Sequence, residues 1–77
     1  MRVEDILNSD TEVSAAALRT AFNGVCVDEV YKGRAVQCEK TDTAYIVKFH
    51  NPNAEFLRKN ANEAVEIIKR ELENPPR

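Results

Sequence analysis

The sequence predicts an α+β domain in which a helix, a three-stranded antiparallel meander and a long C-terminal helix follow one another. Three observations predict it. Strong helix formers follow Ser9, β-branched residues alternate with others between Val25 and His50, and apolar residues recur at helical spacing after Asn51. The long helix should pack on one face of the sheet, because both elements have an apolar side to cover. Residues 1–77 are expected to form a single domain with a small core.

Two helical signals occupy the N-terminal third of the chain. Residues 1–8 hold apolar positions at helical spacing, enough for one extra short helix of one or two turns. Ser9 and Glu12 then have the form of a capping box, in which the first side chain caps the helix and the second binds back to it. Gly24 supplies a C-terminal stop. The pattern therefore predicts a helix over residues 11–22.

The middle of the chain reads as three strands separated by two turns. The strands are expected near Val25–Tyr31, Arg34–Glu39 and Thr43–His50, with turns at Lys32-Gly33 and Thr41-Asp42. If both turns are two-residue loops, Val36 pairs with Val47, and one face of the sheet collects most of the apolar side chains. That face holds Val25, Val27, Tyr31, Val36, Cys38, Tyr45, Val47 and Phe49.

The long helix is predicted from Asn51 to Glu73. Asn51 is a good N-cap and Pro52 suits the first helical position, so the pair marks a start. The prolines after Asn74 mark the end, and residues 75–77 are expected to form a frayed tail. The apolar stripe of this helix consists of Leu57, Ala61, Ala64, Val65, Ile68 and Leu72.

The two cysteines depend on the geometry of the first turn. With a two-residue turn, Cys26 and Cys38 point to opposite faces and cannot form a bridge. A three-residue turn with Gly33 in the left-handed conformation would instead place them directly opposite each other. The two-residue turn gives the more uniform apolar face. We therefore expect free thiols, as befits a reducing compartment.

Composition and residue types argue against several functions. With 43% hydrophobic and 31% charged residues and a net charge of −2, the chain is typical of soluble globular proteins. No apolar run reaches the length of a membrane span, so a cytoplasmic location is expected. His50 lies far along its strand from both cysteines, and the two glycines lie in separate turns, so neither a nucleophilic pair nor a phosphate loop is expected. We predict no enzyme activity, no cofactor and no metal site.

One group of polar residues suggests anion binding. Residues 32–59 carry six basic and three acidic groups, giving +3 in a chain of net charge −2. The meander should bring some of these cations to the end of the sheet where the long helix is predicted to begin, and helix N-termini favour anions. This basic rim consists of Lys32, Arg34, Lys48, His50 and Asn51.

The predicted order of elements, α-β-β-β-α, resembles the double-stranded-RNA-binding domain. The resemblance implies a nucleic-acid-binding module that uses the start of its second helix on phosphates. The chain departs from the family's sequence pattern. Residues 31–34, Tyr-Lys-Gly-Arg, replace the Gly-Pro-x-His turn between the first two strands, and residues 53–57 replace the lysine-rich helix start.

The opposite face of the sheet suggests protein binding instead. Half of its residues are apolar, more than a solvated face needs, and Val30, Ala35 and Ile46 lie at its centre. We therefore predict a small protein-interaction module that associates with itself or with a protein partner and acts by occupying a surface. Phage and mobile-element inhibitors include chains of this size. Nucleic-acid binding through the basic rim is the alternative.

Overall fold

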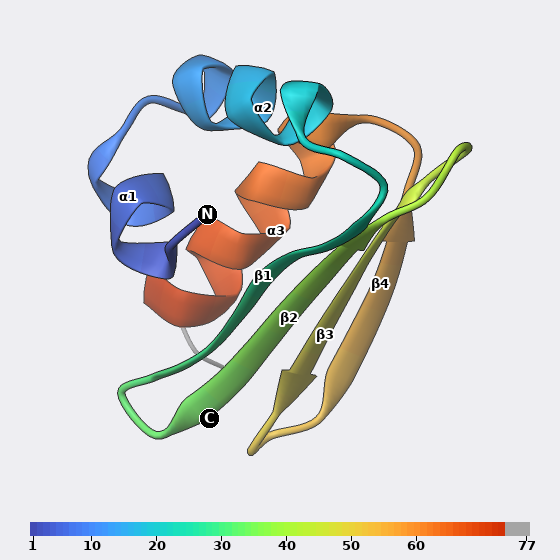
Figure 1. Cartoon of the computed structure of the whole chain (residues 1–77). Helices are drawn as coiled ribbons and strands as arrows, with labels where there is room; N and C mark the ends of the chain where they lie inside the picture. The colour runs from blue at the N-terminus through green and yellow to red at the C-terminus, as the bar shows by residue number, and fades with distance from the viewer. Residues whose placement is uncertain (74–77) are drawn as a thin grey trace.

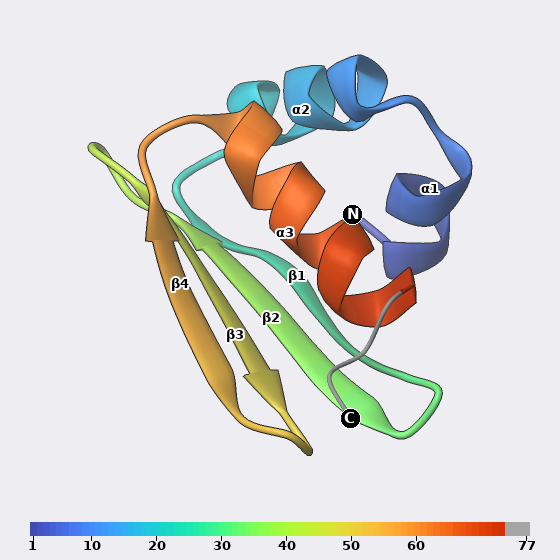
Figure 2. The same ribbon diagram turned by 180° about the vertical axis from the view of Figure 1, so that it is seen from behind.

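A computed structural model describes residues 1–73 as two layers, three helices on one face of a four-stranded antiparallel sheet (Figures 1 and 2). The α+β class is confirmed, and the meander has one strand more than predicted. The predicted helix end at residues 74–76 and the tail at residues 75–77 lie outside the described residues. In chain order, the elements are α1 Val3–Asn8, α2 Thr11–Thr20, β1 Gly24–Tyr31, β2 Arg34–Lys40, β3 Tyr45–His50, β4 Ala54–Arg58 and α3 Ala61–Glu73.

The largest difference from the prediction lies after His50, where one long helix is replaced by a strand and a shorter helix. Asn51 has a φ of +63° and belongs to the turn between β3 and β4, so the prediction that a helix begins there is wrong. The helix is capped by Asn60 instead, whose side-chain oxygen accepts a hydrogen bond from the backbone N–H of Glu63 at 2.9 Å. Asparagine is a strong N-cap, and the sequence offers one at each position.

The strand β4 forms because its alternate side chains fit the sheet. Phe56 is half-buried and its ring meets that of Phe49 edge to face, with centroids 6.1 Å apart. Leu57, the next residue, points away from the helices and is 62% exposed, so the prediction that it is buried on a helix stripe is wrong. The remaining predicted stripe, from Ala61 onward, lies on α3 as expected.

The N-terminal helices follow the prediction with small changes at their ends. The short helix α1 forms, with Val3 and Ile6 fully buried. At the start of α2 the N-cap position is taken by Asp10 rather than by Ser9, and no side chain makes a capping hydrogen bond there. The capping-box prediction is therefore wrong, although the helix begins at Thr11, the predicted residue.

The helix α2 ends at Thr20, two residues before the predicted end. Ala21 is already extended, with φ −68° and ψ 152°. The ammonium group of Lys40 in β2 donates hydrogen bonds to the carbonyls of Arg19 at 2.6 Å and Ala21 at 2.8 Å. A cation on the last carbonyls of a helix satisfies them and complements the helix dipole. The sheet thus fixes the end of α2.

The first hairpin has the predicted two-residue turn, because Tyr31 pairs with Arg34. Its residues Lys32 and Gly33 have φ values of +49° and +82°, the left-handed conformations that match the twist of a tight hairpin. At the other end of this hairpin, β1 has a bulge between Val25 and Val27. The bulge leaves Val25 56% exposed, so the prediction that it belongs to the core face is wrong.

The second hairpin has a four-residue loop instead of the predicted two-residue one. Lys40 pairs with Tyr45, and Val47 pairs with Cys38 rather than with Val36. The hydroxyl of Thr41 closes the loop by accepting a hydrogen bond from the backbone N–H at position 44, at 3.0 Å. A shift of two residues preserves which side chains share a face. The predicted core face is therefore correct in β2 and β3 although the pairs are wrong.

The core lies between that face and α3. Val65 and Ile68 are fully buried and belong to one cluster with four residues of the sheet, as predicted: Val27, Val36, Val47 and Phe49. Two layers of secondary structure thus cover each other's apolar sides.

We expect Ser14→Ala to stabilise the domain. Ser14 is fully buried in α2, and its hydroxyl has no hydrogen-bond partner among the described residues. Removing the hydroxyl avoids the free-energy cost of burying it without a hydrogen bond, and alanine has the higher helix propensity. The free energy of unfolding should therefore rise by about 0.5–1 kcal/mol. Urea denaturation measures this. The neighbouring Ala15→Ser, equally buried, should lower it, and a stabilising effect of that control would contradict the explanation.

Candidate functional site

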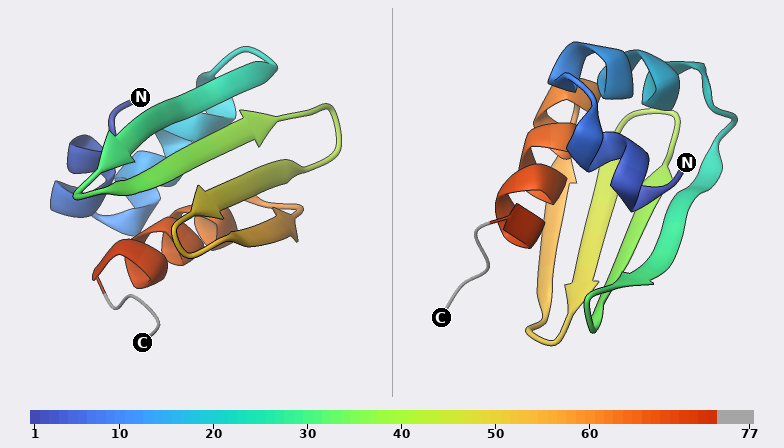
Figure 3. Two further views of the ribbon diagram at one scale, coloured as in Figure 1. Left: turned by 90° about the horizontal axis from the view of Figure 1, so that it is seen from below. Right: turned by 90° about the vertical axis from the view of Figure 1, so that its left-hand side faces the viewer.

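The side of the sheet away from the helices is uncovered within residues 1–73, as the views in Figure 3 also show. Residues paired across antiparallel strands point to the same side, so the register defines rows on this face. We call it the outer sheet face. Its first row is Val25, Glu39, Ile46 and Leu57, its second Asp28, Gln37, Lys48 and Glu55, and its third Val30, Ala35 and His50.

The outer sheet face exposes large apolar side chains. Val25, Val30 and Leu57 are 56%, 68% and 62% exposed, and Ile46 and Ala35 are half-buried beside them. Val30, Ala35 and Ile46 lie where the sequence placed them. Sequence reasoning missed the other two. The bulge that exposes Val25 has no signal of its own, and Leu57 fitted a helix stripe equally well.

The charges on the same face are mostly negative. It carries Asp28, Glu39 and Glu55 against the single ammonium group of Lys48, three minus one, or −2 when His50 is neutral. None of these groups belongs to an ion pair among residues 1–73. The outer sheet face is thus apolar and acidic together, although the sequence segment that supplies most of it is basic on balance.

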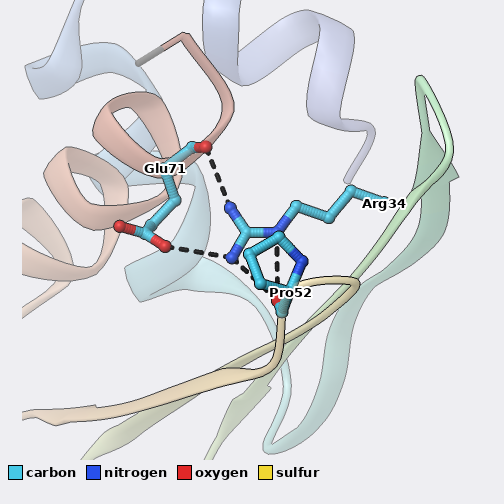
Figure 4. Close-up of polar contacts among 3 residues, drawn as sticks. All are labelled: Arg34, Pro52 and Glu71. Atoms are coloured by element: carbon cyan, nitrogen blue, oxygen red, sulfur yellow. Dashed lines mark hydrogen bonds and ion pairs between the residues drawn. The ribbon is translucent and has the colours of Figure 1, made fainter. Parts of the chain in front are cut away.

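Arg34 of the predicted basic rim is not available to a ligand (Figure 4). Its side chain lies among the core residues, 5% exposed, with the guanidinium carbon 4.6 Å from the centroid of the Phe49 ring. The guanidinium donates to the carbonyl of Pro52 at 2.9 and 3.3 Å. It also donates to the backbone carbonyl of Glu71 at 2.9 Å and pairs with that carboxylate at 3.1 Å. Arg34 therefore joins β2, the β3–β4 turn and the end of α3.

Lys32 and Asn51 lie near one another at the turn end of the sheet. The ammonium group of Lys32 lies 5.5 Å from the centroid of the Tyr31 ring, and the side-chain amide of Asn51 donates to the carbonyl of Gly33 at 3.5 Å. Both side chains are exposed. They support the two hairpin turns and form no built anion site.

The remaining rim residues, Lys48 and His50, project from the outer sheet face. In the strand register, Lys48 lies directly across from Gln37 of β2 and from Glu55 of β4. His50 Nδ1 lies 3.2 Å from the side-chain oxygen of Asn53. The helix N-terminus that the sequence placed beside them is at Ala61, beyond the whole length of β4. The predicted anion site thus lacks both its arginine and its helix.

The two cysteines lie closer together than predicted. The bulge in β1 lets the side chain of Cys26 pack against the core rather than on the outer sheet face, so its predicted placement is wrong. Both thiols are free, as expected. Burial raises the pKa of the Cys38 thiol to about 12, with a smaller contribution from Cys26. Because the thiolate is the nucleophilic form, Cys38 is unreactive near neutral pH.

The raised pKa of Cys38 predicts alkaline destabilisation. The folded chain keeps a proton that the unfolded chain loses, so stability falls as pH rises from about 9, the ordinary value, to about 12. Tyr45, whose pKa is raised chiefly by burial, acts in the same direction. The free energy of unfolding should fall by up to about 1.4 kcal/mol per pH unit from the thiol alone. Urea denaturation between pH 8 and 11 tests this, and Cys38→Val should remove that part of the slope. An unchanged slope in that variant would contradict the assignment.

A second apolar feature lies where α2 meets β1. A hollow of about 370 Å³ is lined by Met1, Ala17, Leu18, Ala21, Phe22, Asn23, Val25 and Cys26. Phe22 at its edge is 94% exposed because α2 ends before it. Sequence reasoning placed Phe22 on the helix, so its exposure could not be foreseen.

Two classes of site are not found in the described part of the chain. Within residues 1–73, no three metal-ligating side chains lie close enough together to hold an ion. No helix there has the length and apolarity to cross a membrane. In comparisons with known proteins, the chain matches no family model, and no curated protein or solved structure is significantly similar to it.

Proposed function

We propose that this chain is a non-catalytic module that binds another protein through the outer sheet face and acts by occupying that protein's surface. The observation that carries the proposal is the exposure of Val25, Val30 and Leu57, each more than half exposed, on one uncovered face. Apolar side chains gathered on a flat sheet are typical of protein interfaces. The burial of the Cys38 thiol supports a role without nucleophilic catalysis.

The charge of the face favours a protein over a nucleic acid. Three carboxylates on the outer sheet face repel phosphates, whereas nucleic-acid affinity comes mainly from cations on the phosphate backbone. Arg34, the central cation of the alternative proposal, is held by Glu71 and by the Pro52 carbonyl. Binding through the basic rim is therefore the weaker candidate.

The same charges favour a different protein over a second copy of the chain. Two copies packed face to face about an axis along the strands would place Asp28 opposite Glu55 of the other copy. An axis across the strands at that row would place each carboxylate opposite its own counterpart. Like charges in an interface cost free energy unless they are compensated. These like-charge contacts disfavour self-association through the outer sheet face and favour a different protein.

We also propose that the module works in the cytoplasm. Two free thiols are typical of proteins in a reducing compartment, which supports the cytoplasm. A small domain that works by occupying a protein surface suits a regulator or inhibitor of the kind that phages and mobile elements encode.

The proposal is tested by selecting random displayed peptides on the immobilised wild-type domain and measuring the affinity of the selected peptides for variants. Leu57→Lys places a charge on the outer sheet face, and Val13→Lys makes the matched change on α2, where the side chain is 60% exposed. We expect the peptides to lose at least tenfold in affinity for Leu57→Lys, about 1.4 kcal/mol, and to bind Val13→Lys as they bind the wild type. Equal binding to all three proteins, or no selected peptide, would overturn the proposal.

Light scattering across a concentration series addresses self-association. The proposal predicts a monomer at high micromolar concentration for the wild-type chain. A wild-type dimer that Leu57→Lys dissociates and Val13→Lys does not would show that the outer sheet face binds a second copy. That result would identify a second copy of this chain, rather than a different protein, as the partner.

A further inference from the structure

We infer that the partner presents a lysine or arginine side chain, flanked by apolar groups, to the carboxylate of Glu39. This inference rests on the proposed function, since it concerns the same outer sheet face. It is carried by the position of Glu39, the one charged residue in the most apolar row of that face. Glu39 is half-buried and directly paired with Val25 on one side and with Ile46 on the other, and Leu57 completes the row.

The first step concerns what happens to this carboxylate when the row is covered. No hydrogen bond or ion pair to the Glu39 side chain is found among residues 1–73, so water solvates it in the free chain. A partner that buries Val25, Ile46 and Leu57 must also remove that water. A buried carboxylate without a partner is costly, and a cation with good geometry offsets the cost. The apolar row can therefore be covered favourably only by a surface that brings a donor to Glu39.

Lysine and arginine are the donors that fit this row. Lysine and arginine have long aliphatic stems that cover apolar surface while the charged head reaches past them. A stem lying on Ile46 and Val25 would bury their apolar surface, which is favourable, and its head would pair with Glu39. The net charge of −2 on the outer sheet face acts in the same direction, because Asp28 and Glu55 attract a basic surface as it approaches.

The position of Glu39 within an apolar row also distinguishes between possible partners. An apolar row that contained no charge would also suit a second copy of the chain or a purely apolar segment. With Glu39 in the row, a purely apolar segment would leave this carboxylate without a partner, and a second copy would bring three carboxylates against one ammonium group to the interface. The occupant is thus a basic and apolar segment of another protein.

The inference is tested with the peptides selected on the wild-type domain. We expect their sequences to contain lysine or arginine next to aliphatic residues more often than the unselected library. The isosteric change Glu39→Gln should weaken them about fivefold, as expected for a partly screened ion pair. The control Glu12→Gln removes an exposed carboxylate from α2 and should leave affinity unchanged. Affinity for the wild-type domain should also fall as salt rises.

The outcomes separate this inference from the proposed function. Peptides that lose affinity for Leu57→Lys but lack basic residues, or that bind Glu39→Gln as tightly as wild type, would overturn the role of Glu39. They would leave the outer sheet face as the binding surface. Peptides indifferent to both Leu57→Lys and Glu39→Gln would overturn both. The urea midpoint of Glu39→Gln, expected to equal that of wild type, excludes unfolding as the cause of a loss.

Discussion

Replacing Ile68 by alanine should lower the free energy of unfolding by about 2–5 kcal/mol, a large part of the stability of so small a domain. Ile68 is fully buried in α3 and belongs to the cluster that joins this helix to the sheet. The truncation removes apolar burial and leaves a cavity that a two-layer domain cannot easily close. Urea denaturation with a constant m-value would measure the loss.

Leu57→Ala is the matched control for this prediction. A single helix from residue 51 to residue 73 would place Leu57 and Ile68 on the same buried stripe, and both truncations would be costly. In the structure Leu57 is 62% exposed on β4, so its truncation should change stability by about 0.5 kcal/mol or less. A loss as large as that of Ile68→Ala would contradict the strand.

The second large effect is expected at the buried ion pair between Arg34 and Glu71. Their side chains are 6% and 13% exposed, and the guanidinium also holds the Pro52 carbonyl. Removing one member leaves the other without its counter-charge in a poorly solvated place. We expect either Arg34→Ala or Glu71→Ala to cost about 3–5 kcal/mol, with the arginine change the larger because it also exposes the face of Phe49.

A double-mutant cycle distinguishes the pair from its parts. The apolar double replacement Arg34→Met with Glu71→Leu should be less destabilised than either of its single variants, Arg34→Met or Glu71→Leu, because no unpaired charge remains buried. Lys48→Ala, at an exposed lysine without an ion pair among the described residues, should change stability by about 0.5 kcal/mol or less. Additive effects in the cycle would show that Arg34 and Glu71 act independently.

Arg34 also explains why the predicted basic rim does not form. A sequence shows the charge of an arginine but not its counter-charge, and Glu71 lies 37 residues further along the chain. Once α3 packs across the sheet, its last turn reaches the start of β2, and the arginine is used to fix that contact. The same packing leaves Lys32, Lys48 and His50 exposed without a helix start beside them.

The outer sheet face likewise depends partly on local sequence pattern and partly on tertiary contacts. Alternation in the sequence placed Val30, Ala35 and Ile46 on one face, because a strand has a strict period of two. Val25 joined them only through a bulge, and Leu57 and Glu55 only through the fourth strand. Glu55 brings the net charge of the face from −1 to −2 when His50 is neutral. We therefore propose a basic surface of another protein as its partner, rather than a second copy or a nucleic acid.

The sequence by itself determined what depends on local pattern: the α+β class, the helices near both ends, three strands, the tight first turn, and the core residues of β2, β3 and α3. Its periodicity could not decide between helix and strand after Asn51, because Leu57 suits either and two asparagines can each cap a helix. The tertiary structure decided it, since the free edge of β3 pairs with residues 54–58 and Phe49 receives the ring of Phe56. Backbone pairing and ring packing are contacts between two strands, and contacts between elements leave no periodic signal in the sequence.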